Sequence, residues 1–125
     1  MVDKINIQKL NCWFGDTHSV KGLSFDVKKN EILGIIGPAN SGKTTFLRTI
    51  NRLNDLNEKF RSDGSIKIDS VDINAIDPET LRKRCGMVFA LPLSLPMSVY
   101  DNVAYGPKRH GKKKRSSLMR PLKKL

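Results

Sequence analysis

Residues that could hold a phosphate group follow one another in the first half of the chain. The stretch reads Gly37-Pro38-Ala39-Asn40-Ser41-Gly42-Lys43-Thr44-Thr45. Its spacing, G-x-x-x-x-G-K-T, is that of the phosphate-binding P-loop, in which glycines let backbone N–H groups approach phosphate oxygens. Lys43 would reach the β- and γ-phosphates, and the Thr44 hydroxyl would be a ligand of the phosphate-bound Mg²⁺. The motif therefore predicts binding of a nucleoside triphosphate.

The flanking segments are those that such a loop needs. The apolar run from Ile32 to Ile36 predicts a strand buried on both faces, and residues 44–53 predict a helix after the loop. Apolar residues recur at helical spacing in this helix, namely Phe46, Leu47, Ile50 and Leu53. The positive end of the helix dipole would face the phosphates. Asn40, within the loop, is of a residue type that tolerates a positive φ. An ordinary glycine-rich turn is the alternative interpretation.

The segments before and after this unit predict further strands. Residues 2–9 and 20–27 alternate apolar and polar side chains, which indicates two half-buried strands in an antiparallel pair. Residues 54–64 are polar and predict a loop, and residues 65–69 alternate again. We therefore expect an α/β chain in which an antiparallel pair precedes the buried strand.

Capping signals predict two short helices near the end of this region. Asp77, followed by proline and an acidic residue, predicts a helix that ends at Arg84. Residues 87–90 are a strand candidate, and residues 91–96 contain two prolines and predict a loop. Ser98 could cap the last helix.

The charge of the chain is concentrated at its C-terminal end. The net charge is +11, yet nine of the 23 basic residues and none of the 12 acidic residues lie in residues 107–125. The remaining 14 basic and 12 acidic residues leave residues 1–106 almost balanced. The charge therefore predicts two regions of different character.

Membrane-spanning and disulfide-rich classes are excluded by the composition. The chain has no apolar run of about 18 residues, which a membrane span needs, and its N-terminus lacks the apolar core of a signal peptide. Cys12 and Cys85 provide neither a disulfide framework nor metal-ligand spacing, so we expect both to pack as small apolar side chains in a reducing cytoplasm.

The order of these features resembles the ATP-binding subunits of ABC transporters, and within that family the phosphate-importer ATPase. The resemblance covers roughly residues 3–111 and rests on four local matches. They are Phe14-Gly15, which lies 29 residues before Lys43, the P-loop from Gly37 to Thr45, residues 51–56, and residues 81–89 followed by residues 100–107. P-loop kinases and GTPases do not carry the fourth match.

The resemblance implies a fold, ligands and partners. The fold would be a P-loop NTPase core of the ABC ATPase type with an N-terminal antiparallel β portion. Residues 1–106 would be the N-terminal part of the ATP-binding domain, and residues 107–125 a basic, disordered tail. ATP and Mg²⁺ would be held by residues 37–45, with adenine stacked on Phe14; Phe14 could equally be a core or strand aromatic. Partners would be importer permease subunits and a second ATPase subunit, on the inner face of the plasma membrane.

The chain also departs from the family pattern. Where the family has a glutamine after the strand at residues 87–89, this chain has Ala90, whose methyl group can neither touch Mg²⁺ nor sense the γ-phosphate. The family's signature motif, Walker B strand and switch histidine are not in this sequence. The resemblance therefore implies an N-terminal half, truncated before the second half of the domain, that binds ATP but does not hydrolyse it alone. We expect such a fragment to expose apolar surface.

Two other functions remain open on the sequence. The basic run Lys112-Lys113-Lys114-Arg115 could bind nucleic acid or another anionic surface, although such runs are commonly solvated and no aromatic residue interrupts this one. We therefore do not expect nucleic acid as a partner. A stand-alone P-loop kinase is disfavoured because acceptor-site and lid residues are missing. A non-functional truncated gene product is the third alternative.

Overall fold

The computed structural model describes residues 3–111, which divide into two compact units with the boundary between Met87 and Val88. The first unit contains, in chain order, β1 (Asp3–Phe14), β2 (Thr17–Lys28), α1 (Lys43–Ile50), the 3-10 turn η1 (Asn54–Leu56), β3 (Phe60–Ile68), β4 (Val71–Asp72), the 3-10 turn η2 (Ile73–Ala75) and α2 (Pro78–Arg84). The second unit contains α3 (Val99–Arg109).

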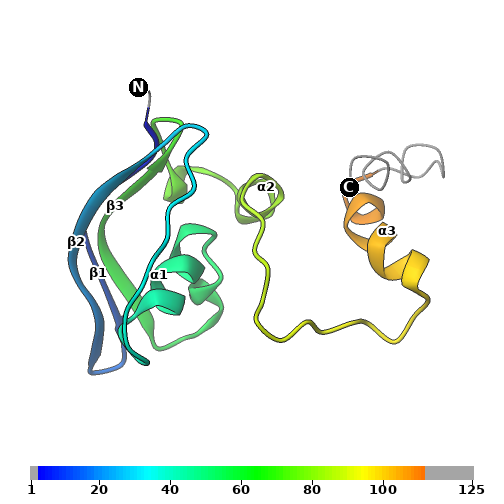
Figure 1. Ribbon diagram of the computed structural model, residues 1–125, viewed down its shortest axis with the longest axis horizontal. Helices are drawn as coiled ribbons and strands as arrows, with labels where there is room; N and C mark the ends of the chain where they lie inside the picture. The colour runs from blue at the N-terminus through cyan, green and yellow to red at the C-terminus, as the bar shows by residue number, and fades with distance from the viewer. Residues whose placement is uncertain (1–2, 112–125) are drawn as a thin grey trace. The chain divides into compact units, whose positions relative to one another are not determined.

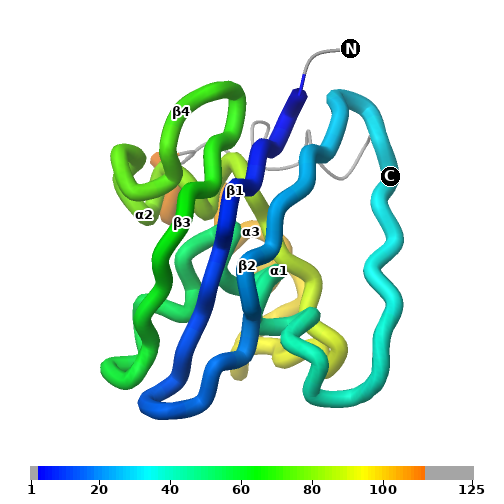
Figure 2. The backbone as a smooth tube through the Cα atoms, turned by 90° about the vertical axis from the view of Figure 1, so that its left-hand side faces the viewer, coloured from blue at the N-terminus to red at the C-terminus, as the bar shows by residue number. Residues whose placement is uncertain are grey.

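The first unit is built on an antiparallel sheet with the strand order β2-β1-β3-β4. The helix α1 lies against one face of this sheet (Figures 1 and 2). Ile5 pairs with Val27 and Ile7 pairs with Phe25, so the alternating apolar residues of β1 and β2 share a face. The predicted antiparallel pair is thereby confirmed, with strands of 12 residues each that are longer than predicted.

The hydrophobic core fills the space between the sheet and α1. Its buried members are Ile7, Leu10, Cys12, Val20, Phe46, Ile50, Ile66, Ile68, Ile73 and Leu81. Of the residues predicted to face the core from α1, Leu47 does not, since 45% of it is exposed. Burial raises the pKa of the Cys12 thiol, so this cysteine packs as a neutral side chain, as predicted.

A network of polar groups ends α1 and fixes the chain that follows it. The buried Asn54 side chain donates to the carbonyl of Thr45 and to the hydroxyl of Thr49, both at 2.8 Å. From α2, the guanidinium of Arg82 donates to the carbonyls of Asn51 at 3.2 Å and Arg52 at 2.8 Å. The two bonds from Arg82 satisfy carbonyl groups directly after the C-terminal end of α1, where the helix itself offers no donor.

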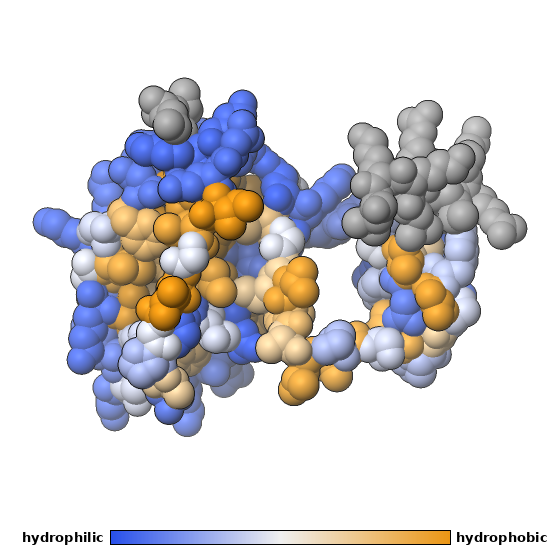
Figure 3. Space-filling model, viewed as in Figure 1, coloured by the Kyte–Doolittle hydropathy of each residue, from blue (hydrophilic) through white to orange (hydrophobic). Residues whose placement is uncertain are grey.

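The predicted buried strand at residues 32–36 does not form. These residues follow β2 as an extended segment without strand pairing, running alongside β2 (Figure 2). Ile32 is 99% and Ile36 is 98% exposed. A central strand is stable only with hydrogen-bonded neighbours and helices on both faces, and no described segment provides them. Apolar side chains accordingly reach the surface of this unit (Figure 3).

Two further predictions about the strands are wrong. Residues 87–90 contain no strand either, and Val88 is 98% exposed. The predicted loop at residues 54–64 is instead η1 and the first half of β3, which begins at Phe60. Residues 60–64 pair with β1 through their backbone, and backbone pairing does not require apolar side chains.

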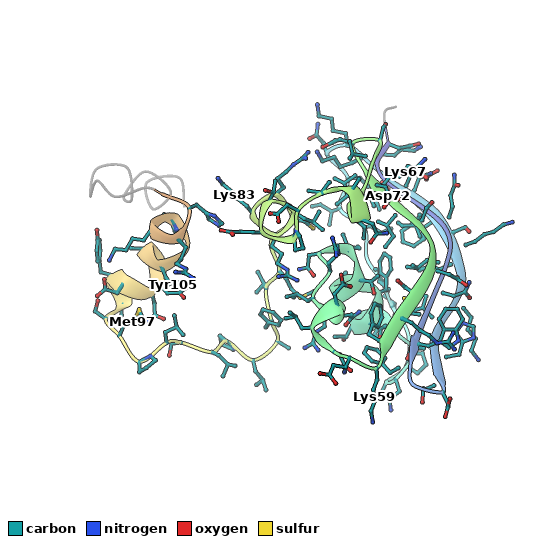
Figure 4. The ribbon with its side chains drawn as sticks, turned by 180° about the vertical axis from the view of Figure 1, so that it is seen from behind. Lys59, Lys67, Asp72, Lys83, Met97 and Tyr105 are labelled. Carbon is teal, nitrogen blue, oxygen red and sulfur yellow. The ribbon has the colours of Figure 1, made fainter. Side chains whose placement is uncertain are left out.

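The second unit is organised by α3 and the loop before it. Ser98 caps this helix as predicted, since its hydroxyl accepts from the Asp101 N–H at 3.1 Å. The Asn102 side chain bonds backbone groups of Leu95 and Met97, which fixes the proline-containing loop. Figure 4 labels Met97 in this loop and Tyr105 on the helix. Residues 107–109 belong to α3 rather than to a disordered tail, and residues 112–125 lie outside the described residues.

Candidate functional site

The backbone of the predicted P-loop has the conformation that its residue types allow. Residues 39–42 form turns and bends between the extended segment and the first residue of α1, Lys43. Asn40 has φ 62° and Gly42 has φ 92°. The positive φ of Asn40 is one that its residue type tolerates. Gly42 is the N-cap of α1, so the free N–H groups of the first helical turn begin directly after the loop.

Gly42 is required by a close contact with backbone, whereas the close contact at Gly37 is with a side chain that can rotate away. A Cβ at residue 42 would lie 2.5 Å from the carbonyl oxygen of Ser19 and 3.3 Å from a methyl group of Val20, both on β2. A Cβ at residue 37 would lie 2.9 Å from the hydroxyl of Ser41. The first contact joins the loop to the sheet, and the second closes the loop on itself.

The ammonium group of Lys43 lies across the loop. It donates to the carbonyl oxygens of Gly37 at 2.7 Å and Pro38 at 2.6 Å, and to the hydroxyl of Ser41 at 3.1 Å. The lysine side chain therefore extends back from the start of α1 to the first two residues of the motif. Lys43 and the first residues of α1 line one hollow, and a positive charge with free helix N–H groups attracts anions.

A hollow of about 360 Å³ lies at the start of α1. It is lined by Thr17, Ser19, Asn40, Ser41, Gly42, Lys43, Thr44 and Thr45. This lining contains hydroxyl, amide and ammonium groups and no carboxylate, so it suits a polyphosphate, and the exposed Thr44 can offer its hydroxyl to Mg²⁺. The residues present therefore fit a magnesium–triphosphate group. None of the side chains in this lining could act as a carboxylate base toward water.

A second, larger hollow of about 610 Å³ adjoins the other side of the loop. Gly37, Pro38 and Lys43 contribute to it, together with apolar residues of β2 and of the extended segment before the loop. Its lining combines these apolar residues with His18 and Lys21, whereas Thr44 and Thr45 of α1 line the smaller hollow and not this one. We therefore assign the phosphate chemistry to the smaller hollow, where hydroxyl groups and the helix start meet.

The aromatic residues at the end of β1 lie apart from both hollows. Phe14 is half-buried and packs against Phe60, with ring centroids 5.2 Å apart, and it lines neither hollow. Trp13 is stacked on His18 at 4.5 Å, and the guanidinium of Arg61 lies 4.4 Å from its ring centroid. The structure thus brings residues 37–45 together, while Phe14 stays at the end of the hairpin.

Thr17 and Ser19 on β2 line the phosphate hollow and were missed by the sequence analysis. Both lie between the predicted strands at residues 2–9 and 20–27, in a stretch to which no element was assigned. The pairing of β1 with β2 shifts register at Ser19, so the period of a regular strand gives no signal for these two residues. The two residues reach the loop through the contact between Ser19 and Gly42, which forms only in the folded chain.

The residues that narrowed the resemblance to phosphate importers have structural roles here. In residues 51–56, Asn51 and Asn54 are buried, and the backbone carbonyls of Asn51 and Arg52 accept hydrogen bonds from Arg82.

Ala90 is exposed and lies in the second unit. Across residues 3–111, no three His, Cys, Asp or Glu residues are grouped to hold a metal. No helix in the same range could span a bilayer.

Comparison with known proteins identifies a family and a similar solved structure. A family model described as ABC transporter matches residues 20–124. Among solved structures, the chain is similar to one titled "Structure of a bacterial Atm1-family ABC exporter with ATP bound", with a TM-score of 0.71 and 25% identity. That match covers 82% of this chain but 18% of the exporter chain. The family match spans more than half of the sequence, and the chain therefore belongs to the ABC transporter family.

Proposed function

We propose that this chain binds ATP with Mg²⁺ through residues 37–45 as the ATP-binding part of an ABC transporter ATPase. The observation that carries the proposal is the hollow at the start of α1, where Lys43, free N–H groups and hydroxyls converge without a carboxylate. Bound Mg²⁺ neutralises charge on the phosphates. Thr44 is the proposed ligand of the metal, and Phe14 is proposed to meet the adenine ring.

The proposed activity is binding without hydrolysis by this chain alone. Hydrolysis requires a positioned water and a residue that orients it, in addition to charge stabilisation of the phosphates. The hollow is lined by neutral polar groups and one lysine. Ala90, at the position where the family resemblance implies a glutamine, offers only a methyl group.

The proposed partners are membrane permease subunits and a second ATPase subunit, because ABC ATPase domains work with transmembrane subunits. In such an assembly the chain would lie on the cytoplasmic face of the plasma membrane. The finer assignment to phosphate import is supported by the resemblance of residues 51–56. The solved structure compared above is an exporter. The proposed direction of transport and the proposed cargo therefore rest on the resemblance of residues 51–56 to the phosphate-importer ATPase.

Equilibrium filter binding with labelled ATP, run beside a phosphate-release assay, tests this proposal on the full chain. We expect retained ATP that depends on Mg²⁺, with phosphate release no faster than in protein-free buffer. Release above that background, and absent from the Lys43→Ala variant, would overturn the claim of binding without turnover. No retained ATP in folded protein would overturn the binding itself.

A further inference from the structure

We propose that residues 32–36 pair with the same residues of a second copy of this chain, as antiparallel strands related by a two-fold axis at Gly34. The proposal starts from free backbone groups. In the described part of the chain, no backbone N–H or C=O of residues 32–36 has a hydrogen-bond partner. Figure 2 shows this segment at the border of the first unit, with β2 on one side of it only. An extended segment with free backbone groups is a template for another strand.

The sequence of the segment is nearly symmetric about Gly34, which suits it to pairing with itself. In this register Ile32 lies opposite Ile36 of the other copy, and Leu33 lies opposite Ile35. Gly34 meets Gly34, and the space around it is open. Ile32 and Ile36 are the most exposed side chains of the segment, at 99% and 98%. The pairing therefore covers each of them with an apolar side chain of the other copy, as a two-fold interface does with one shared patch.

The hydrogen bonds of Lys43 agree with this register. Opposite residues in an antiparallel pair alternate between hydrogen-bonded and non-hydrogen-bonded positions. With Gly34 in a hydrogen-bonded position, Gly37 falls in a non-hydrogen-bonded one. The carbonyl of Gly37 is already occupied, because it accepts from the Lys43 ammonium at 2.7 Å. Pro38 follows directly and has no N–H, so the pairing ends there.

Charges at the two ends of the segment select a second copy in the antiparallel direction. No residue from 32 to 42 is charged, so the pairing buries no charge although the chain has a net charge of +11. The exposed Glu31 of each copy lies opposite Gly37 of the other, within reach of the Lys43 ammonium that is bound there. A parallel pairing would place Glu31 opposite Glu31, and like charges directly opposite each other destabilise a strand pair.

Oxidative cross-linking of the full-length Gly34→Cys variant, without nucleotide, tests the two-fold axis. The new thiols of two copies face each other across a hydrogen-bonded pair, at a Cα separation of about 5.5 Å that suits a disulfide. Leu56→Cys, at a residue that is 73% exposed, is the matched control. The unmodified chain measures the background from Cys12 and Cys85. On non-reducing gels we expect several times more covalent dimer from Gly34→Cys than from either. Equal yields would overturn the proposal.

Exchange of the two charges tests the register without a new cysteine. In sedimentation equilibrium, Glu31→Lys and Lys43→Glu should each weaken self-association by about threefold to tenfold, the effect of losing exposed ion pairs. The double variant keeps the net charge and should restore association, because each copy again offers opposite charges to the other. Lys29→Glu changes the net charge as Lys43→Glu does, but it lies opposite no charge and should have little effect. Summed losses in a folded double variant, with folding verified by circular dichroism, would overturn the proposal.

Discussion

The carbonyl oxygen of Ser19 lies 2.5 Å from where a Cβ on Gly42 would be, so β2 and the first turn of α1 meet without room for any side chain. This contact fixes the start of α1 against the sheet. It is also where the phosphate hollow begins, because both residues line it. The sheet therefore positions the binding loop directly, through a glycine that packing and backbone conformation both require.

We predict that Gly42→Ala destabilises the first unit and weakens ATP binding. At φ 92° alanine is strained, and its Cβ would collide with Ser19. The expected loss is about 1–3 kcal/mol in the free energy of unfolding, measured by urea denaturation. Gly34→Ala is the matched control, since Gly34 has open space around it. Equal losses for the two variants would contradict the account of this contact.

A second prediction concerns Arg82, which donates to two backbone carbonyls at the C-terminal end of α1. Arg82→Ala should leave these carbonyls without their donor and cost about 1–3 kcal/mol in the free energy of unfolding. Lys83→Ala removes the same charge from the next residue of α2, which is exposed and is labelled in Figure 4. Thermal unfolding should separate the two variants, and identical melting temperatures would show that the capping bonds carry no stability.

A third prediction is a pH-dependent contribution from Asp69, which follows β3. The ammonium of Lys4, at 2.8 Å, and the guanidinium of Arg84, at 2.9 Å, hold the pKa of this carboxyl below its usual value of 3.8. Because the folded-state pKa is depressed, the contribution is complete above 3.8 and disappears as the pH falls through the folded value. Asp69→Asn should therefore lower the urea midpoint at neutral pH and have little effect in strong acid.

The control for the pH series is Asp16→Asn, which alters an exposed carboxyl at the β1–β2 turn. Added salt should reduce the effect of Asp69→Asn at neutral pH, because the ion pairs are exposed to solvent. A midpoint difference between the unmodified chain and Asp69→Asn that stays constant from neutral pH to well below 3.8 would reject the ion pairs as its source.

The exposed segment before the loop leads to a fourth prediction. Ile32 and Ile36 are almost fully exposed, so the chain should self-associate with rising concentration. Replacing both with serine should lower the weight-average mass in sedimentation velocity and reduce binding of an apolar dye. Leu56→Ser, at a residue that is 73% exposed in η1, is the control and should change little. Unchanged association in the double variant would assign it to another surface.

Local signals in the sequence predicted those parts of the structure that local interactions determine. The caps at Asp77 and Ser98 form as predicted, because each needs only a side-chain oxygen and an N–H three residues away. The alternation of apolar and polar residues in β1 and β2 also predicted their antiparallel pairing, since a short hairpin brings the two strands together. The glycine spacing of the loop also predicted a sharp turn of the backbone. Turns and bends form at residues 39–42, because the residues that they bring together are close in sequence.

The failures involve partners that are distant in sequence. Residues 32–36 have the composition of a central strand, but a strand is defined by its neighbours, and none of the described segments pairs with it. At β3, the polar residues before Ile66 concealed a strand. Its Gly64 takes φ 87° and lies so close to β1 that a Cβ there would be 2.4 Å from the carbonyl oxygen of Lys9. Thr17 and Ser19 were missed for the same reason, since only the folded contact with Gly42 brings them to the loop.

The most direct test of the central claim is a calorimetric titration of the folded full chain with MgATP, with folding verified by circular dichroism, beside the Lys43→Ala variant. Among the described residues that line the phosphate hollow, Lys43 is the charged one. We predict saturable binding by the unmodified chain and binding weaker by roughly tenfold or more in the variant, the effect of losing a charge-assisted contact. Identical titrations for the two folded proteins would contradict the claim that this loop holds the triphosphate.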